Sequence, residues 1–241
     1  MDRPRLSRPR FTPPPRARLR TLAVQLMLLW LMAGSASGCR ILIGVIMAVR
    51  GRPMIDADFK MKTRRSMTDK GKKTLVLCTA PESVKGDSGS LDLDIITELT
   101  RQLRAHDIEM IDPDKVVAWR EEHLGDLDEF DLVNLGREMK ADFIIQVQLD
   151  KFQIRDESSP TLLRGKAQGK VFVTVLEYDR SGKYKPPAHM VYTQPFDSSY
   201  PVHQPATIEQ VTVPVFRKQF FDRLTDELSR LFYDHRPGET F

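Results

Sequence analysis

Reactive and metal-binding side chains are scarce in this 241-residue chain, which has two cysteines and five histidines. No two histidines stand at a spacing typical of a metal-ligand pair. The chain has no Gly-x-Gly-x-x-Gly turn, no Walker loop and no Cys-x-x-Cys pair, so it lacks the usual nucleotide and redox motifs. We therefore expect no cofactor, no metal and no catalytic set of residues that can be named from the sequence.

The positive charge of the chain is confined to its first residues. The whole chain has a formal charge of +4 and a pI near 9.1. Seven arginines and one acid fall within residues 1–38, which leaves residues 39–241 with a charge of −2. Because a basic surface is what non-specific nucleic-acid binding needs, we expect no nucleic-acid partner for the part after residue 38.

Residues 1–38 have the three parts of an export signal. The seven arginines lie in residues 1–20, residues 21–38 are uncharged and mostly apolar as far as Ala33, and small residues lead to Cys39. A basic head, an apolar centre and a small-residue cleavage zone form the secretory pattern. The arginines stay on the cytoplasmic side, because positive charge beside an apolar segment sets its orientation.

The residues Ala36, Ser37, Gly38 and Cys39 resemble the lipobox of bacterial lipoproteins, in which the cysteine is acylated and becomes the mature N-terminus. Alanine stands where leucine is usual, and the two small residues fit. The resemblance implies a signal peptide over 1–38 and a palmitate-type anchor that binds the membrane. Each buried CH₂ adds about 0.8 kcal/mol, so several acyl chains on one cysteine attach stably. Ordinary cleavage near Ala36 and an uncleaved anchor are the alternatives.

The chain after Cys39 is predicted to be a tether followed by one domain. Residues 41–49 are apolar but too few to span a bilayer. Residues 50–73 are basic, and attraction to anionic lipid or cell-wall polymer is their alternative role. We predict a lipid anchor and basic tether over 39–73, a single envelope domain over 74–235 and a tail over 236–241.

The spacing of apolar residues predicts alternating strands and helices in the first half of the domain. Ser90 or Asp92 stands where a helix cap is expected, and Pro113 stands at a first helical position after Asp112. The predicted elements are a strand at 74–78, a helix through Ile95, Ile96, Leu99 and Leu103, a strand at 108–111, a helix from Asp112, and a helix over 130–139.

Alternation of apolar and polar residues predicts antiparallel strands in the second half. One apolar helical face follows, with Pro214 in its first turn, and it is expected to cover the sheet. The predicted elements are a strand over 143–149, a connection over 149–165, a strand at 171–176, a turn at 179–182, a strand near 190–196, and a helix through Phe216, Phe220, Leu224, Leu228 and Leu231.

The predicted order is thus β-α-β-α-α-β-β-β-α. Early helical crossovers favour parallel pairing, and the later hairpin is antiparallel. The predicted fold class is α+β, with a mixed β-sheet of about five strands packed on helices behind an N-terminal signal and lipid anchor.

This order resembles the periplasmic domain of the penicillin-binding-protein activator and curli-secretion lipoproteins, also likened to the N-terminal domain of the Tol-system propeller protein. The residues that carry the likeness are 75–78, 108–112 and 135–145, where a helix ending in Ala141 and Asp142 runs into an apolar strand. The resemblance covers about residues 74–233 and implies a small envelope domain without shared catalytic residues.

Two sequence patterns resemble known functional sites, a serine-protease nucleophile and a calcium-binding loop. We expect neither to be functional here. Residues 86–89 match the Gly-Asp-Ser-Gly around a trypsin-type serine, but that chemistry needs a histidine base and an orienting acid on an all-β fold. A group of acids could hold a hard cation but lacks the glycine of an EF-hand turn, so we interpret it as solvated: Asp126, Asp128, Glu129 and Asp131. Cys78 is interpreted as a small buried hydrophobe.

Tyr184, Tyr192 and Tyr200 stand among prolines near the second hairpin. Aromatic side chains anchor protein interfaces, so these three are candidate partner contacts, with core packing as the alternative. We predict a membrane-anchored envelope lipoprotein that is not an enzyme and acts as an interaction, assembly or regulatory module with an envelope protein partner. An envelope-associated hydrolase without a recognisable motif is the alternative.

Overall fold

The computed structural model describes residues 53–85, 90–122 and 129–237, and from Met54 these form one compact unit. In chain order the elements are α2 (Asp58–Thr63), β1 (Lys73–Thr79), α3 (Glu82–Lys85), α4 (Leu91–Ala105), β2 (Glu109–Met110), α5 (Pro113–Glu122), α6 (Glu129–Met139), β3 (Phe143–Asp156), β4 (Ser159–Tyr178), β5 (Tyr184–Tyr200), β6 (Ala206–Thr207) and α7 (Val213–Ser229).

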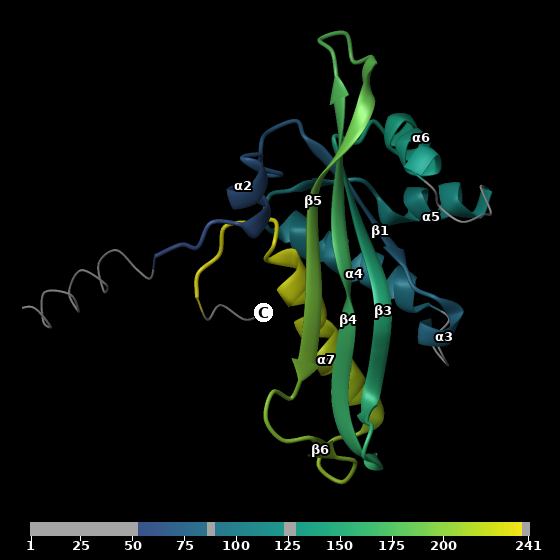
Figure 1. Cartoon of the computed structure of the whole chain (residues 1–241), viewed down its shortest axis with the longest axis vertical. Helices are drawn as coiled ribbons and strands as arrows, with labels where there is room; N and C mark the ends of the chain where they lie inside the picture. Colours follow the sequence, from purple (N-terminus) through teal and green to yellow (C-terminus); the bar gives the residue numbers. More distant parts are fainter. Residues whose placement is uncertain (1–52, 86–89, 123–128, 238–241) are drawn as a thin grey trace, which may run out of the picture. The chain divides into compact units, whose positions relative to one another are not determined.

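The strands form one mixed sheet in the order β2-β1-β3-β4-β5, with β6 paired to β4 (Figure 1). Strand β1 runs parallel to β2 and β3, because helical crossovers connect them. Strands β3, β4 and β5 pair antiparallel. The predicted α+β class, mixed sheet and element order are confirmed, with α2, α3 and β6 as additions.

Helices pack on both faces of the sheet, and β1 shows how its residues are divided between them. Successive side chains of a strand point to opposite faces. Leu75 and Leu77 belong to an apolar cluster with α5 and α6. Val76 and Cys78 belong to a larger cluster with α2, α4 and α7. Cys78 is therefore a buried core residue, as its apolar run predicted.

The hairpin of β3 and β4 is much longer than predicted. The interpretation of residues 149–165 as a connection is wrong, because β3 continues to Asp156 and β4 starts at Ser159. The tight turn is held by Asp156, whose Oδ1 accepts from the backbone N–H of Ser158 at 2.9 Å. The extension is covered by α7, since the Phe152 ring stacks on Phe220 with centroids 5.5 Å apart.

Residues 54–73 differ from the predicted basic tether because two apolar side chains anchor them in the core. Phe59 and Met67 are both 0 % exposed. The Phe59 ring lies 5.8 Å from Phe143 and 5.5 Å from Tyr192 between centroids. Ala57 is buried as well, at 1 % exposure, but three buried residues in a polar segment of this length form no helical or strand period. The sequence pattern therefore showed only the charge of the segment.

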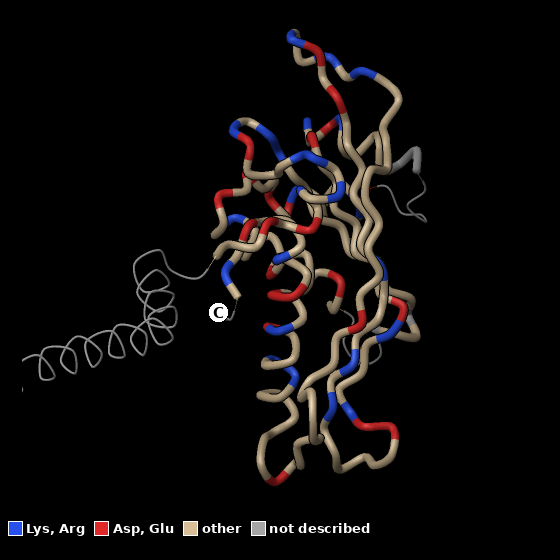
Figure 2. The backbone as a smooth tube through the Cα atoms, turned by 60° about the vertical axis from the view of Figure 1, so that its left-hand side comes forward, with Lys and Arg blue, Asp and Glu red and all other residues tan. Residues whose placement is uncertain are grey.

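The cations of this segment are not a free basic face, because acids lie among them (Figure 2). Ion pairs join Lys60 to Asp56 and Asp234, Lys62 to Asp58, Arg65 to Glu177, and Lys72 to Asp142. The start of the domain is also tied to its end, since Ile55 and His235 exchange two backbone hydrogen bonds of 2.8 and 3.0 Å.

The predicted starts of three helices agree with the structure in position, and only the capping bond expected at α4 is not made. Asp112 caps α5 by accepting from the N–H of Asp114 at 3.2 Å, and Pro214 lies in the first turn of α7. Of the two residues predicted to cap α4, Ser90 stands at the N-cap position but makes no side-chain cap bond. Asp92 lies inside the helix, where it pairs with Arg120 at 3.1 Å.

Candidate interaction groove

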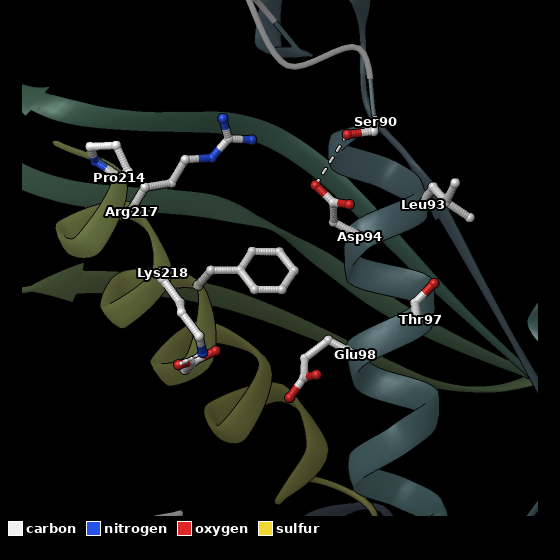
Figure 3. A pocket seen from close by; sticks show the side chains of 10 residues that line it. Ser90, Leu93, Asp94, Thr97, Glu98, Pro214, Arg217 and Lys218 are labelled. Atoms are coloured by element: carbon white, nitrogen blue, oxygen red, sulfur yellow. Dashed lines mark hydrogen bonds and ion pairs between the residues drawn. The ribbon is translucent and has the colours of Figure 1, made fainter.

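Helices α4 and α7 lie against the same face of the sheet and leave an open groove of about 740 Å³ between them (Figure 3). Both N-terminal halves contribute to it. Its lining residues are Ser90, Leu93, Asp94, Thr97 and Glu98 from the α4 side and Pro214, Arg217, Lys218, Phe221 and Asp222 from α7.

The groove exists because the two helices touch at one end and diverge at the other. Toward their C-terminal ends, Gln102 Nε2 donates to Thr225 Oγ1 at 3.0 Å, and both residues are buried. The helices separate toward Ser90 and Pro214 (Figure 3). Phe221 packs partly against the core beneath them, so the groove has an apolar component.

The two walls carry opposite charge. Asp94 and Glu98 project from α4, and Arg217 and Lys218 project from α7 (Figure 3). One turn further along, the signs are reversed, with Arg101 on α4 and Asp222 on α7. The groove is therefore polar across its width and along its length.

Ion pairs within each helix hold several of these charges in place. Arg101 binds Glu98 through two contacts of 2.5 and 2.8 Å, and Lys218 binds Asp222 at 2.5 Å. The hydrogen bond from Arg101 lowers the pKa of Glu98, with smaller lowering effects from Gln102 and the charge of Lys218. Glu98 therefore keeps its negative charge on the groove wall.

Arg217 is the cation of the groove that makes no bond with a described residue. It reaches from α7 toward the α4 side, and no described residue forms a hydrogen bond or ion pair with its guanidinium (Figure 3). Leu93, on the facing helix, is 39 % exposed. A guanidinium without a bond to any described residue suits a protein contact, because arginine is enriched at interfaces.

The three candidate tyrosines do not form one surface. Tyr192 is 3 % exposed and belongs to the large core cluster. Tyr200 is half-buried on the same face, with its ring 5.7 Å from Phe216. Tyr184 packs with the opposite cluster and lies under Arg137, whose Cζ is 5.3 Å from the ring. Irregular pairing between β4 and β5 separates them by shifting the register.

Several residues singled out in the sequence lie outside the described residues or have undescribed side chains. Neither the lipobox nor its cysteine is described, so lipidation stays a prediction. These residues are Ala36, Ser37, Gly38 and Cys39, the tetrapeptide 86–89, and the acids Asp126, Asp128, Glu129 and Asp131.

Within residues 53–85, 90–122 and 129–237, no group of three or more His, Cys, Asp or Glu side chains could hold a metal ion. In the same ranges, no helix has the length and apolar content needed to cross a bilayer. The groove was not predicted, since it depends on how two helices distant in sequence pack. The only hint in the sequence was that positions 94 and 98 are acidic while positions 217 and 218 are basic.

No protein-family model matches the chain, and no curated protein matches it. Solved structures that match include the hypothetical protein CT253 from Chlamydia trachomatis, with 12 % identity, a TM-score of 0.38 and coverage of 66 % of this chain and 95 % of that one. The lipoprotein GNA1162 from Neisseria meningitidis matches with 9 % identity, a TM-score of 0.37 and coverage of 66 % and 98 %.

The PelC dodecamer from Paraburkholderia phytofirmans matches with 11 % identity, a TM-score of 0.33 and coverage of 75 % of this chain and 96 % of that one. Bacterial lipoproteins are thus among the matching structures. At these identities and TM-scores, none of the matches assigns a family or an activity to this chain.

Proposed function

We propose that this protein is a cell-envelope lipoprotein, held at a membrane through acylated Cys39, whose domain acts outside the cytoplasm as a non-catalytic protein-interaction module. The observation that carries the proposal is the order of arginine-rich head, uncharged apolar stretch and small residues that ends at Cys39. The compact unit begins only at Met54, so cleavage before Cys39 leaves every described element intact.

The interaction surface in this proposal is the groove between α4 and α7. It presents Arg217, which has no bond to any described residue, an accessible Leu93 and a wall of opposite charge formed by Asp94 and Glu98. These features supply apolar contact together with charge complementarity, which fixes partner choice and orientation. Of the three tyrosines, Tyr192 lies inside the core and is not part of this surface.

Metabolic labelling with an alkyne analogue of palmitate tests the anchor. The wild type and a Cys78→Ala variant should both be labelled, because Cys78 is buried in the core. Cys39→Ala should carry no label and should leave the membrane fraction. Equal labelling of the Cys39→Ala variant and the wild type would reject the anchor.

Photo-cross-linking in intact cells tests the surface. A photoreactive residue in place of Arg217 should give a covalent adduct, whereas the same residue in place of exposed Arg180, in the turn between β4 and β5, should not. Adduct formation at Arg180 alone, or at neither position, would count against the groove as the contact surface.

A further inference from the structure

The charges of the groove are self-complementary. Three charged positions at or next to the groove on α4 have counterparts of opposite sign on α7. In order from the N-terminal end, these are Asp94, Glu98 and Arg101 on α4 and Arg217, Lys218 and Asp222 on α7.

The two rows of charges run along the groove from the same end. Both helices begin at the same end of the groove, where Ser90 and Pro214 line it (Figure 3). The charge of Lys218 acts on Glu98, and the charge of Asp222 acts on Arg101, so the charges of the two helices lie near each other. Opposite signs therefore face each other across the groove.

This arrangement determines what a second copy would meet. A two-fold axis that lies in the contact plane and runs along the groove places α4 of one copy over α7 of the other, with both helices running in the same direction. Asp94 then meets Arg217 of the second copy, and Glu98 meets Lys218. Arg101 meets Asp222, and the two-fold axis makes each of these three pairs form twice.

The charges are also available for such contacts. Arg217 has no bond with any described residue, and the Lys218 side chain is 75 % exposed although it pairs with Asp222. Leu93 is 39 % exposed and Val215, in the first turn of α7, is 50 % exposed. These apolar side chains supply the area that charge pairs alone do not provide.

We propose that two copies of this chain pair through the groove between α4 and α7, about a two-fold axis along the groove, with Asp94 of each copy facing Arg217 of the other. This deepens the proposed function, on which it rests, by naming a second copy as the partner of that surface. Membrane anchoring strengthens the pairing, because confinement raises the effective concentration of the copies.

A charge-swap experiment on the full-length, lipidated protein in detergent tests this geometry. Asp94→Arg places two cations opposite each other at both contacts of a homodimer, and Arg217→Asp places two anions there. Each variant alone should dimerise at least about tenfold more weakly than wild type, because like charges repel. A mixture should form heterodimers, since Arg at 94 then faces Asp at 217 and the second contact is native.

The readout is co-purification of differently tagged copies together with sedimentation analysis of size. Arg223→Asp, at an exposed position of α7 that does not line the groove, is the matched control and should dimerise like wild type. Thermal unfolding of each variant shows whether it is folded. If a reversal does not fold, Arg217→Gln replaces it and should weaken dimerisation to a smaller extent.

Three results would overturn the inference: a monomeric wild type, a mixture of the two reversal variants that stays monomeric, or an adduct at Arg217 that contains a different protein instead of a second copy. If Cys39 is still labelled with palmitate, each of these results rejects the pairing but not the lipid anchor. Loss of labelling with intact dimers would instead remove the anchor and keep the pairing.

Discussion

The phenol of Tyr192 donates a 2.5 Å hydrogen bond to Oδ2 of Asp58 and so joins edge strand β5 to helix α2. Burial raises the pKa of Tyr192, and the Asp58 carboxylate adds to the rise. Lys62 lies 2.9 Å from the same carboxylate oxygen and 5.4 Å from the centroid of the tyrosine ring. The segment before β1 is thereby fixed to the sheet.

Removal of this hydroxyl should destabilise the domain. We expect Tyr192→Phe to lower the free energy of unfolding by about 1–2 kcal/mol, because the buried hydrogen bond to Asp58 is lost while the ring packing remains. Urea denaturation measures the change. Tyr200→Phe is the control and should cost less, since its hydroxyl makes only a 3.5 Å contact with Gln219. Equal losses would show that the Asp58 bond contributes nothing particular.

Truncation of Phe59 tests whether the segment before β1 belongs to the domain. Phe59→Ala should cost about 3–5 kcal/mol, as for large aromatic residues truncated in a core. Met61→Ala, two residues away on the same helix and at a side chain 58 % exposed, should change stability by less than about 0.5 kcal/mol. If Phe59→Ala is as stable as the wild type, residues 54–73 do not contribute to the folded domain and act as a tether.

A close approach of backbone and ring makes Gly165 hard to replace. A Cβ there would lie 2.3 Å from Cγ of Phe220, in α7. We expect Gly165→Ala to destabilise the protein by about 1–3 kcal/mol through overpacking, measured by thermal or urea unfolding.

The double variant Gly165→Ala, Phe220→Leu isolates the cause of this effect. If the ring is the obstacle, Gly165→Ala should cost less in the Phe220→Leu background than in the wild type. Costs that simply add would contradict a clash between these two residues.

The pH dependence of stability should report the pair of Lys60 and Asp234. The Lys60 ammonium, 2.7 Å away, and the N–H of Ala57 lower the pKa of Asp234. A carboxyl whose folded pKa lies below its unfolded value stabilises the fold above the unfolded pKa, and this contribution is lost as pH falls through the folded pKa.

Asp234→Asn should therefore be less stable than wild type at pH 7, and the difference should shrink between about pH 5 and pH 2. Unfolding midpoints across this range measure it. Asp69→Asn, at an exposed acid, is the control and should follow the wild-type curve. A gap that stays constant to the lowest pH would show that the carboxylate charge of Asp234 is not the stabilising feature.

The sequence predicted those parts of the fold in which one helix or strand carries its own pattern. Alternation at 143–149 located β3, and apolar residues from Phe216 to Leu228 located α7. The end of β3 was missed because Lys151, Gln153 and Arg155 look like loop residues until α7 covers Phe152. Helix α2 was missed because its burial rests on Phe59 alone.

The groove could not be predicted from spacing, because it arises from the divergence of two helices joined at Gln102 and Thr225. The sequence shows which positions are acidic and which are basic. Which of them face each other across the groove depends on how α4 and α7 pack. The three tyrosines show the same limit, since irregular pairing along β5 sends Tyr184 and Tyr192 to opposite faces.

The central claim is that the mature protein begins at acylated Cys39 and holds this domain at a membrane. Mass spectrometry of the protein purified from the membrane fraction tests it most directly. We predict an N-terminal peptide that starts at Cys39 and carries the added mass of acyl chains. An unmodified polypeptide that starts at Met1 and is recovered in the soluble fraction would contradict the account.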